Sequence, residues 1–136
     1  VEEQMTQLEI GKAKVVLEGE KTAILCFGTF LHAALPVAEK FNTTLVDMRF
    51  VKPLDKVLLK QLIATHSQIV TVEENTIAGG AGSAVSEFLA TQQYSGKVLH
   101  IGLPDTFIEQ GTQQEIYTLL KLDSKGIEEQ FCEFFN

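Results

Sequence analysis

The stretch from Gln68 to Ser83 constrains the fold of this 136-residue chain more than any other part of the sequence. Its first part, residues 69–72 (Ile-Val-Thr-Val), is a β-branched run short enough to be a buried strand. A polar segment at residues 73–75 (Glu-Glu-Asn) comes next. Three closely spaced glycines then follow: Gly79, Gly80 and Gly82. Beyond them apolar residues recur every three or four positions, as on one face of a helix. A strand, a polar loop, a glycine turn and a helix in this order are typical of a parallel α/β sheet.

The rest of the chain predicts four more strands and four more helices around this unit. Apolar and β-branched runs indicate strands at residues 14–18, 23–27, 44–48 and 98–101. Helical spacing of apolar residues follows Gly28, Asp55, Thr112 and Asp123. The first two strands are close in sequence, so we expect them to pair antiparallel, with the first strand at the edge. The whole order predicts a three-layer α/β/α domain with a five-stranded, mostly parallel sheet.

Local signals indicate where several helices begin. Asp55 is a good N-cap residue, and Thr112 and Glu115 have the spacing of a capping box. Pro36 is tolerated only in a first helical turn, so its helix should begin only a few residues before it. Residues 102–111 are expected to form a loop that is long enough to suspect of function.

The overall composition limits the kinds of partner. The net charge of −7 opposes binding to nucleic acid or to an anionic membrane, and no apolar run reaches the roughly 20 residues that span a bilayer. Cys26 and Cys132 lack CxxC spacing, so we expect reduced, packed thiols in a cytoplasmic protein. The histidines His32, His66 and His100 are far apart and share no ligand spacing with other residues, so no metal site is expected.

The start of the chain, Val-Glu-Glu-Gln, has neither an initiator Met nor the basic and apolar parts of a signal peptide. We expect residues 1–13 to be a linker or lead-in and residues 14–136 to be one domain. We also expect the chain to be a piece of a longer protein.

The glycine loop at residues 79–83 has two interpretations. It could cradle a phosphate, because a helix N-terminus offers free N–H groups and the positive end of the helix dipole. Alternatively, the glycines permit the turn and close packing of the helix on the sheet, with Ser83 helping to cap the helix. Glu73 and Glu74, just upstream, would repel a phosphate, so we favour the packing interpretation.

Glu73 and Glu74 are also residue types that can form an acid–base pair. Adjacent residues of a strand point in opposite directions, however, and cannot easily flank one substrate atom. We therefore expect both carboxylates to form hydrogen bonds at the carboxyl end of the sheet.

Three further polar side chains have a functional and a structural interpretation. Arg49 and Lys52 follow a strand, where α/β sheets place ligands. We favour ion pairs with Asp47, Asp55 or a neighbouring domain over an anion site. His100 lies in an apolar strand and is expected to be a core or interface histidine and not a base.

Six short strings occur in order and at plausible distances along the chain. They are Asp-Met-Arg-Phe-Val-Lys-Pro-Leu-Asp at 47–55, Val-Thr-Val-Glu-Glu-Asn at 70–75, Gly-Gly-Ala-Gly-Ser at 79–83, Ile-Gly-Leu-Pro-Asp at 101–105, Phe-Ile-Glu-Gln-Gly-Thr-Gln at 107–113 and Leu-Asp-x-x-Gly-Ile at 122–127. Through them, residues 8–135 closely resemble the C-terminal domain of the 1-deoxy-D-xylulose-5-phosphate synthase family, within the thiamine-diphosphate-dependent transketolase superfamily.

The resemblance implies a homodimer of three-domain subunits that joins pyruvate to glyceraldehyde 3-phosphate with loss of CO2, making a precursor of isoprenoids, thiamine and pyridoxal. In that family thiamine diphosphate and Mg2+ bind to the first two domains, and this chain resembles the third. The Gly-Asp-Gly pattern for Mg-diphosphate and a counterpart of the activating Glu are not found in this sequence. We therefore expect no catalytic, cofactor-binding or metal-binding residue here, and no activity from the chain alone.

In this superfamily the matching strand-end segment lies near the interdomain face. The resemblance therefore implies that polar residues fasten this domain to the cofactor-binding domains or to a second identical subunit. The residues expected at such interdomain, subunit or anion contacts are Arg49, Lys52, Asp55, Glu73, Glu74, Asn75, Gly79, Gly80, Gly82 and Ser83. An exposed apolar or mixed patch is expected where the other domains dock.

Two alternatives remain open at this point. One is a stand-alone anion-binding or small-molecule-binding module that uses the loop from Gly79 to Ser83. The other is the third domain of a sister enzyme, such as a transketolase or the beta subunit of a 2-oxoacid dehydrogenase.

Overall fold

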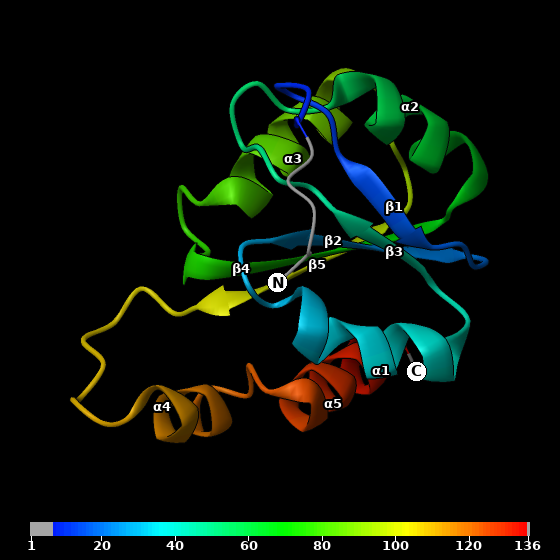
Figure 1. Cartoon of the computed structure of the whole chain (residues 1–136). Helices are drawn as coiled ribbons and strands as arrows, with labels where there is room; N and C mark the ends of the chain where they lie inside the picture. The colour runs from blue at the N-terminus through cyan, green and yellow to red at the C-terminus, as the bar shows by residue number, and fades with distance from the viewer. Residues whose placement is uncertain (1–6, 136) are drawn as a thin grey trace.

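A computed structural model describes residues 7–135 and shows one mixed sheet between two layers of helices (Figure 1). The strands are β1 (Lys14–Leu17), β2 (Thr22–Phe27), β3 (Thr44–Asp47), β4 (Gln68–Thr76) and β5 (Lys97–Leu103). The helices are α1 (Leu31–Phe41), α2 (Lys56–Thr65), α3 (Ala81–Thr91), α4 (Gln113–Leu119) and α5 (Ser124–Phe135). The strands lie in the order β1-β3-β2-β4-β5, and only the β1–β3 pair is antiparallel. The predicted fold class is confirmed.

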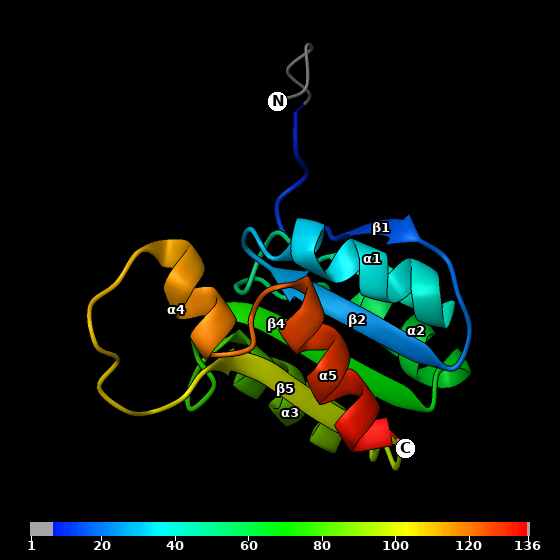
Figure 2. The ribbon, with the colours of Figure 1, turned by 90° about the horizontal axis from the view of Figure 1, so that it is seen from below.

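Two apolar clusters hold the layers together. Alternate residues of a strand face opposite sides of a sheet. Ile24 and Val70 accordingly pack on the side covered by α1 and α5. Leu25 and Ile69 pack on the side covered by α2 and α3. Figures 1 and 2 show these two helix pairs on opposite faces of the sheet. All six residues of β2 are buried, which explains the uninterrupted apolar run at residues 23–27.

The position of β1 corrects one prediction. We expected β1 to pair with β2, its neighbour in sequence, but β1 pairs with β3. The reason is that β2 is already flanked on both sides by parallel strands: the crossover through α1 places β3 on one side, and β4 lies on the other. β2 therefore has no free edge for an added strand, whereas β3 has one, on the side away from β2. The predicted antiparallel, edge position of β1 is confirmed.

Three element boundaries differ from the prediction. β4 continues through the polar segment that we expected to be a loop, and its register with β5 shifts between Val72 and Thr76. β5 likewise extends to Leu103 and takes the first two residues of the predicted loop. Helix α1 begins at Leu31, so Pro36 lies beyond the first turn and deeper than expected. Burial of Ala34, Val37 and Ala38 against the sheet compensates for the backbone hydrogen bond that a proline cannot donate.

Both cysteines are free thiols. Burial, reinforced by the nearby Asp47 carboxylate, raises the pKa of Cys26 to about 12, so this thiol is a packing residue and not a nucleophile. The helices within residues 7–135 include none that is long and apolar enough to cross a membrane. Of the predicted lead-in, residues 1–6 lie outside the described part of the chain, and residues 7–13 contain neither helix nor strand.

Candidate functional site at the carboxyl ends of the strands

The polar residues predicted from sequence meet where β4 ends and α3 begins. A hollow of about 460 Å3 lies at this point. Six of the predicted residues line it: Glu73, Glu74, Asn75, Gly79, Gly80 and Ser83. The other lining residues are Phe27, Val51, Ala81, Ala84 and Glu87, and the sequence motifs did not indicate them as site residues. Gly82 is buried beneath the hollow, whereas Arg49, Lys52 and Asp55 lie outside it.

Glu73 is the N-terminal cap of α3, although it comes from the neighbouring strand. Its side chain is 2% exposed. One carboxylate oxygen, Oε2, accepts a hydrogen bond of 2.6 Å from the amide of Ala81, and Oε1 accepts one of 2.9 Å from the amide of Gly82. A carboxylate at this point also interacts favourably with the positive end of the helix dipole. The buried negative charge of Glu73 is therefore used to start the helix.

The other amides of the glycine loop also have acceptors. The amide of Gly79 donates to Ser83 Oγ at 3.0 Å. The amide of Gly80 donates to the carbonyl of Ile77 at 3.3 Å, and the amide of Ser83 donates to the carbonyl of Gly80 at 3.1 Å. With Ala81 and Gly82 bound to Glu73, each amide from residue 79 to residue 83 is occupied. A phosphate would find no free N–H group in this loop.

Two of the glycines are required by close packing. A Cβ atom on Gly80 would lie 2.2 Å from Glu73 Oε2. A Cβ atom on Gly82 would lie 2.6 Å from both Thr71 Oγ1 and His100 Nδ1. Gly79 differs, because it adopts φ +76 in open space. These contacts support the packing interpretation of the glycine loop. Ser83 has a different role from the one expected, since it holds the loop and does not cap α3.

Glu74 points away from Glu73 and holds a different loop. Its Oε1 accepts a hydrogen bond of 2.6 Å from the amide of Thr29 and a second one from the Thr29 hydroxyl. Gly28, which has φ +84, allows this close approach, since a Cβ atom there would lie 3.1 Å from the Glu74 carboxyl carbon. The two neighbouring carboxylates therefore bind separate segments, and they do not form an acid–base pair.

Arg49 and Asp55, which follow β3, are engaged in local contacts. Arg49 Nε lies 3.3 Å from Asp47 Oδ2, one of the expected ion pairs. Asp55 caps α2 by accepting the amide of Leu58 at 3.0 Å, and its other oxygen accepts the amide of Ala13 at 3.1 Å. Burial alone would raise the pKa of Asp55, but these amide hydrogen bonds and the charge of Lys12 lower it overall.

His100 links β5 to its neighbours. Its Nδ1 lies 2.6 Å from Thr71 Oγ1 on β4, and its Nε2 lies 2.8 Å from Ser86 Oγ on α3. Burial lowers the pKa of His100, and the negative charge of Glu73 opposes this effect. Both ring nitrogens are engaged between two hydroxyls, so His100 is a structural histidine, as expected. The sequence did not indicate Thr71 and Ser86 as its partners.

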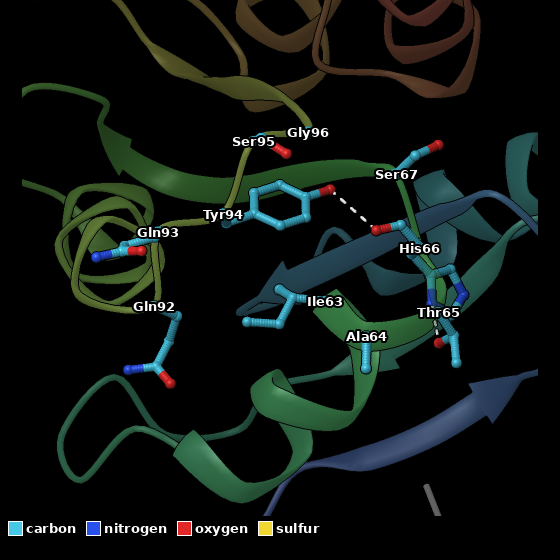
Figure 3. Close-up of a pocket in the computed structure, with 10 residues that line it drawn as sticks. All are labelled: Ile63, Ala64, Thr65, His66, Ser67, Gln92, Gln93, Tyr94, Ser95 and Gly96. Atoms are coloured by element: carbon cyan, nitrogen blue, oxygen red, sulfur yellow. Dashed lines mark hydrogen bonds between the residues drawn. The ribbon is translucent and has the colours of Figure 1, made fainter.

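A second hollow lies at the opposite end of the sheet (Figure 3). It is lined by residues 63–67 and 92–96. The Tyr94 hydroxyl donates to the backbone carbonyl of His66 at 3.1 Å, and His66 Nε2 lies 2.8 Å from Thr44 Oγ1. These groups are already hydrogen-bonded in contacts that join the two loops, and no pair of charged side chains lines this hollow.

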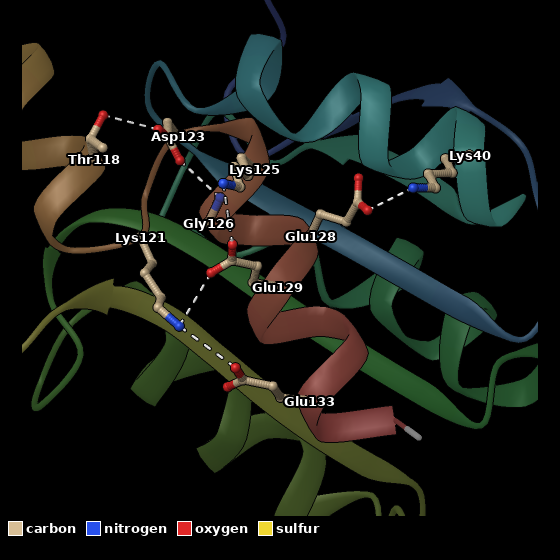
Figure 4. Close-up of polar contacts among 9 residues, drawn as sticks. All are labelled: Lys40, Thr118, Lys121, Asp123, Lys125, Gly126, Glu128, Glu129 and Glu133. Carbon is tan, nitrogen blue, oxygen red and sulfur yellow. Dashed lines mark hydrogen bonds and ion pairs between the residues drawn. The ribbon is translucent and has the colours of Figure 1, made fainter.

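The charged residues of α5 form a surface network (Figure 4). Lys40 Nζ lies 2.6 Å from Glu128, and Lys121 Nζ lies 3.3 Å from Glu129. Asp123 starts the helix by accepting the amide of Gly126 at 2.8 Å. Exposed ion pairs of this kind contribute little stability. Within residues 7–135 no group of three or more His, Cys, Asp or Glu residues could hold a metal ion.

The sheet order β1-β3-β2-β4-β5, with helices on both faces, defines a three-layer α/β/α domain. The family described as transketolase, C-terminal domain, matches residues 11–127, and the chain belongs to this family.

Among curated relatives, the chain is similar to 1-deoxy-D-xylulose-5-phosphate synthases. It is 65% identical to the one from Psychromonas ingrahamii over 136 residues, which is 100% of this chain and 22% of the relative. It is 58% identical to the one from Mannheimia succiniciproducens over 97% of this chain and 21% of the relative. The chain thus spans about a fifth of the length of these relatives. The resemblance deduced from the six strings is confirmed.

The fold also resembles a solved structure described as split gene transketolase, inactive beta4 tetramer. The TM-score is 0.82 and the identity is 28%, over 95% of this chain and 44% of that chain.

Proposed function

We propose that this chain is the C-terminal, non-catalytic domain of a thiamine-diphosphate-dependent 1-deoxy-D-xylulose-5-phosphate synthase. The whole enzyme would condense pyruvate with glyceraldehyde 3-phosphate and release CO2, and so serve the synthesis of isoprenoid and thiamine precursors in the cytoplasm. The observation that carries this proposal is the 65% identity to such a synthase along the full length of the chain.

The role of this domain would be assembly. Residues 14–136 would form the domain and residues 1–13 its lead-in. The partners would be the other domains of the same polypeptide and a second identical subunit, and the contact residues would be those that surround the strand ends. Glu73, Glu74 and Asp55 already hold loops and helix starts in place. They would give the interdomain face its shape, and exposed groups around them would make the contacts.

No catalytic, cofactor or metal residue is assigned to this chain. Thiamine diphosphate and Mg2+ would bind to other domains of the enzyme. The loop from Gly79 to Ser83 is the candidate phosphate-binding loop of this chain. Two of its amides already donate hydrogen bonds to the Glu73 carboxylate. This occupancy argues against the stand-alone anion-binding module.

Calorimetry and an activity assay test the proposal together. The 136-residue chain should show no heat of binding with thiamine diphosphate and Mg2+, and no carboligase activity with pyruvate and glyceraldehyde 3-phosphate. The longer polypeptide from the same gene should show both. Cofactor binding or turnover by the 136-residue chain would refute the proposal, as would the absence of synthase activity in a folded longer polypeptide.

A further inference from the structure

The exposed apolar side chains gather on the side where the chain enters the domain. Among the described residues, nine large hydrophobic side chains are exposed. Six of them belong to residues 8–16 or to residues 51–57: Leu8, Ile10, Val15, Val16, Val51 and Val57. Ile10 is 75% exposed and Val57 is 61% exposed. Apolar side chains concentrated in this way on a protein surface mark an interaction site.

These two segments lie side by side. A Cβ atom on Gly11 would lie 2.8 Å from Pro53 Cγ, and the amide of Ala13 donates to Asp55 at 3.1 Å. Residues 11–13 of the lead-in therefore lie against the loop that precedes α2. Figure 1 shows this blue segment beside the turn into α2. We call the surface formed by residues 8–16 and 51–57 the lead-in face.

A groove of about 720 Å3 continues this face toward α3. Its lining includes Val51, Pro53 and Leu54 from the loop, and Ala84 and Phe88 from the helix. The groove shares Val51 with the hollow at the carboxyl ends of the strands, so the two recesses are continuous. The side chains of Lys52, Lys56 and Glu87 supply charges around this mainly apolar recess.

The edge strand β1 adds a second reason for a covering partner. Among residues 7–135, β1 pairs only with β3, so its outer edge presents backbone groups with no strand partner there, beside Val15 and Val16. Exposed apolar edges of this kind favour association with another chain or segment, and proteins usually cover them. Figure 2 shows the lead-in leaving the body of the domain at this edge.

We infer that the lead-in face docks onto the domain that immediately precedes this one in the same polypeptide. This inference rests on the proposed function and specifies its assembly surface. The family is described as a C-terminal domain, and the chain covers 22% of a synthase relative, so a domain of this kind follows another domain in its polypeptide. The preceding domain therefore joins the chain at the end of the lead-in, next to the exposed apolar residues. A partner attached through so short a segment is present at high effective concentration.

Cysteine labelling tests this docking in the longer polypeptide. A background with Cys132→Ser leaves only buried Cys26 within these 136 residues, and Val57→Cys then places one reactive thiol on the lead-in face. Labelling at position 57 is followed by mass spectrometry of the peptide that contains it, so that cysteines elsewhere in the longer polypeptide do not count. Maleimide should react with it about tenfold more slowly in the longer polypeptide than in the 136-residue chain. The matched control is Lys125→Cys on α5, whose side chain is 86% exposed. Its rates should agree within about twofold.

Three results would overturn the inference. The first is an equal rate for Val57→Cys in both polypeptides, and the second is equal slowing at both positions. The third is slowing in the 136-residue chain as its concentration rises, which would identify a second copy as the occupant. Synthase activity measured on the same samples separates the two ideas. An active polypeptide with an unprotected Val57→Cys thiol refutes the docking alone, whereas a protected but inactive one refutes the proposed function alone.

Discussion

Helices α3 and α4 both begin with a glutamate that is bound to backbone amides, but the glutamates come from different places. In α4 the capping box is local: the Thr112 hydroxyl accepts the amide of Glu115, and the Glu115 carboxylate accepts the amide of Thr112 at 3.0 Å. In α3 the cap is Glu73, eight residues before the first bonded amide and on a strand. The first arrangement uses neighbours in sequence, and the second requires the strand to lie beside the helix.

The two helices also differ in burial. α3 buries five residues against the sheet, whereas α4 has no fully buried residue. The cap of α3 is therefore part of the core, and its loss should affect the whole domain. The cap of α4 stabilises only one short peripheral helix, so its loss should destabilise that helix and leave the rest of the domain unchanged. Four predictions test this difference, from the largest expected effect to the smallest.

Substitution Glu73→Gln should be the most destabilising. The amide side chain keeps one acceptor but turns an NH2 group toward a backbone N–H, and it removes the charge at the helix start. We expect a loss of about 2–4 kcal/mol in the free energy of unfolding, measured with denaturant. The matched control Glu74→Gln, at an exposed site, should lose about 0.5–1 kcal/mol. Equal losses in the two variants would contradict the core role of Glu73.

Substitution Gly82→Ala should come next. The new Cβ atom would press on Thr71 and His100, and overpacking costs about 1–3 kcal/mol. The gain of about 1 kcal/mol in helix propensity only partly offsets this cost. Thermal unfolding should therefore show a net loss of about 1–2 kcal/mol. The control is Gly79→Ala. Its new Cβ atom would meet no neighbour, so any loss of stability in this variant reports backbone strain at φ +76 and not overpacking. If the Gly82→Ala variant were more stable than the parent, the space between Gly82 and the side chains of Thr71 and His100 would be large enough for a methyl group, which would contradict this prediction.

The pH dependence of stability should report on His100. Burial lowers its pKa below the usual 6.5. The unfolded chain therefore binds a proton first, and stability should fall as the pH decreases from about 6.5 through the lowered value. Unfolding measured between pH 7.5 and pH 5 should show a steeper loss in the parent than in His100→Gln. Parallel curves for the two proteins would exclude this contribution, since His32 and His66 are common to both.

Substitution Thr112→Ala should have the smallest effect on the whole domain. Loss of the cap costs α4 about 0.5–1 kcal/mol. Because α4 has no fully buried residue, we expect the global free energy of unfolding to change by less than about 0.5 kcal/mol. Hydrogen exchange should instead accelerate at the amides of Glu115 and Ile116. Gln114→Ala, in the same turn, should not accelerate it. A large global loss in Thr112→Ala would mean that α4 is coupled to the core.

The fold followed from sequence patterns wherever the signal was local. The apolar run of β2, the N-cap Asp55 and the capping box at Thr112 all appear as expected. The partner of β1 was predicted wrongly, because the edge available to it depends on where the crossover places β3. Polar residues within β4 hid its true length, since bonding to β5 and α3 holds an otherwise loop-like sequence in a strand.

The candidate site was predicted in its location but not in its detail. The sequence placed Glu73, Glu74 and the glycines together at the carboxyl end of the sheet, and the structure gathers them there. It did not indicate that the two carboxylates bind α3 and the Thr29 loop, respectively. The sequence also did not indicate that Val51 lines both the hollow at the strand ends and the groove beside α3. A single valine after a strand carries no signal that it is exposed.

By itself, the sequence determined the layered α/β architecture and the local helix starts, because these depend on the period of apolar residues and on contacts within one turn. The tertiary structure decided what the charged residues do. Glu73 could have faced solvent, a phosphate or a helix, and the choice depended on α3 packing within hydrogen-bonding distance of the end of β4. A contact between the end of a strand and the start of a helix depends on where the two elements lie in space, and no local sequence pattern encodes that.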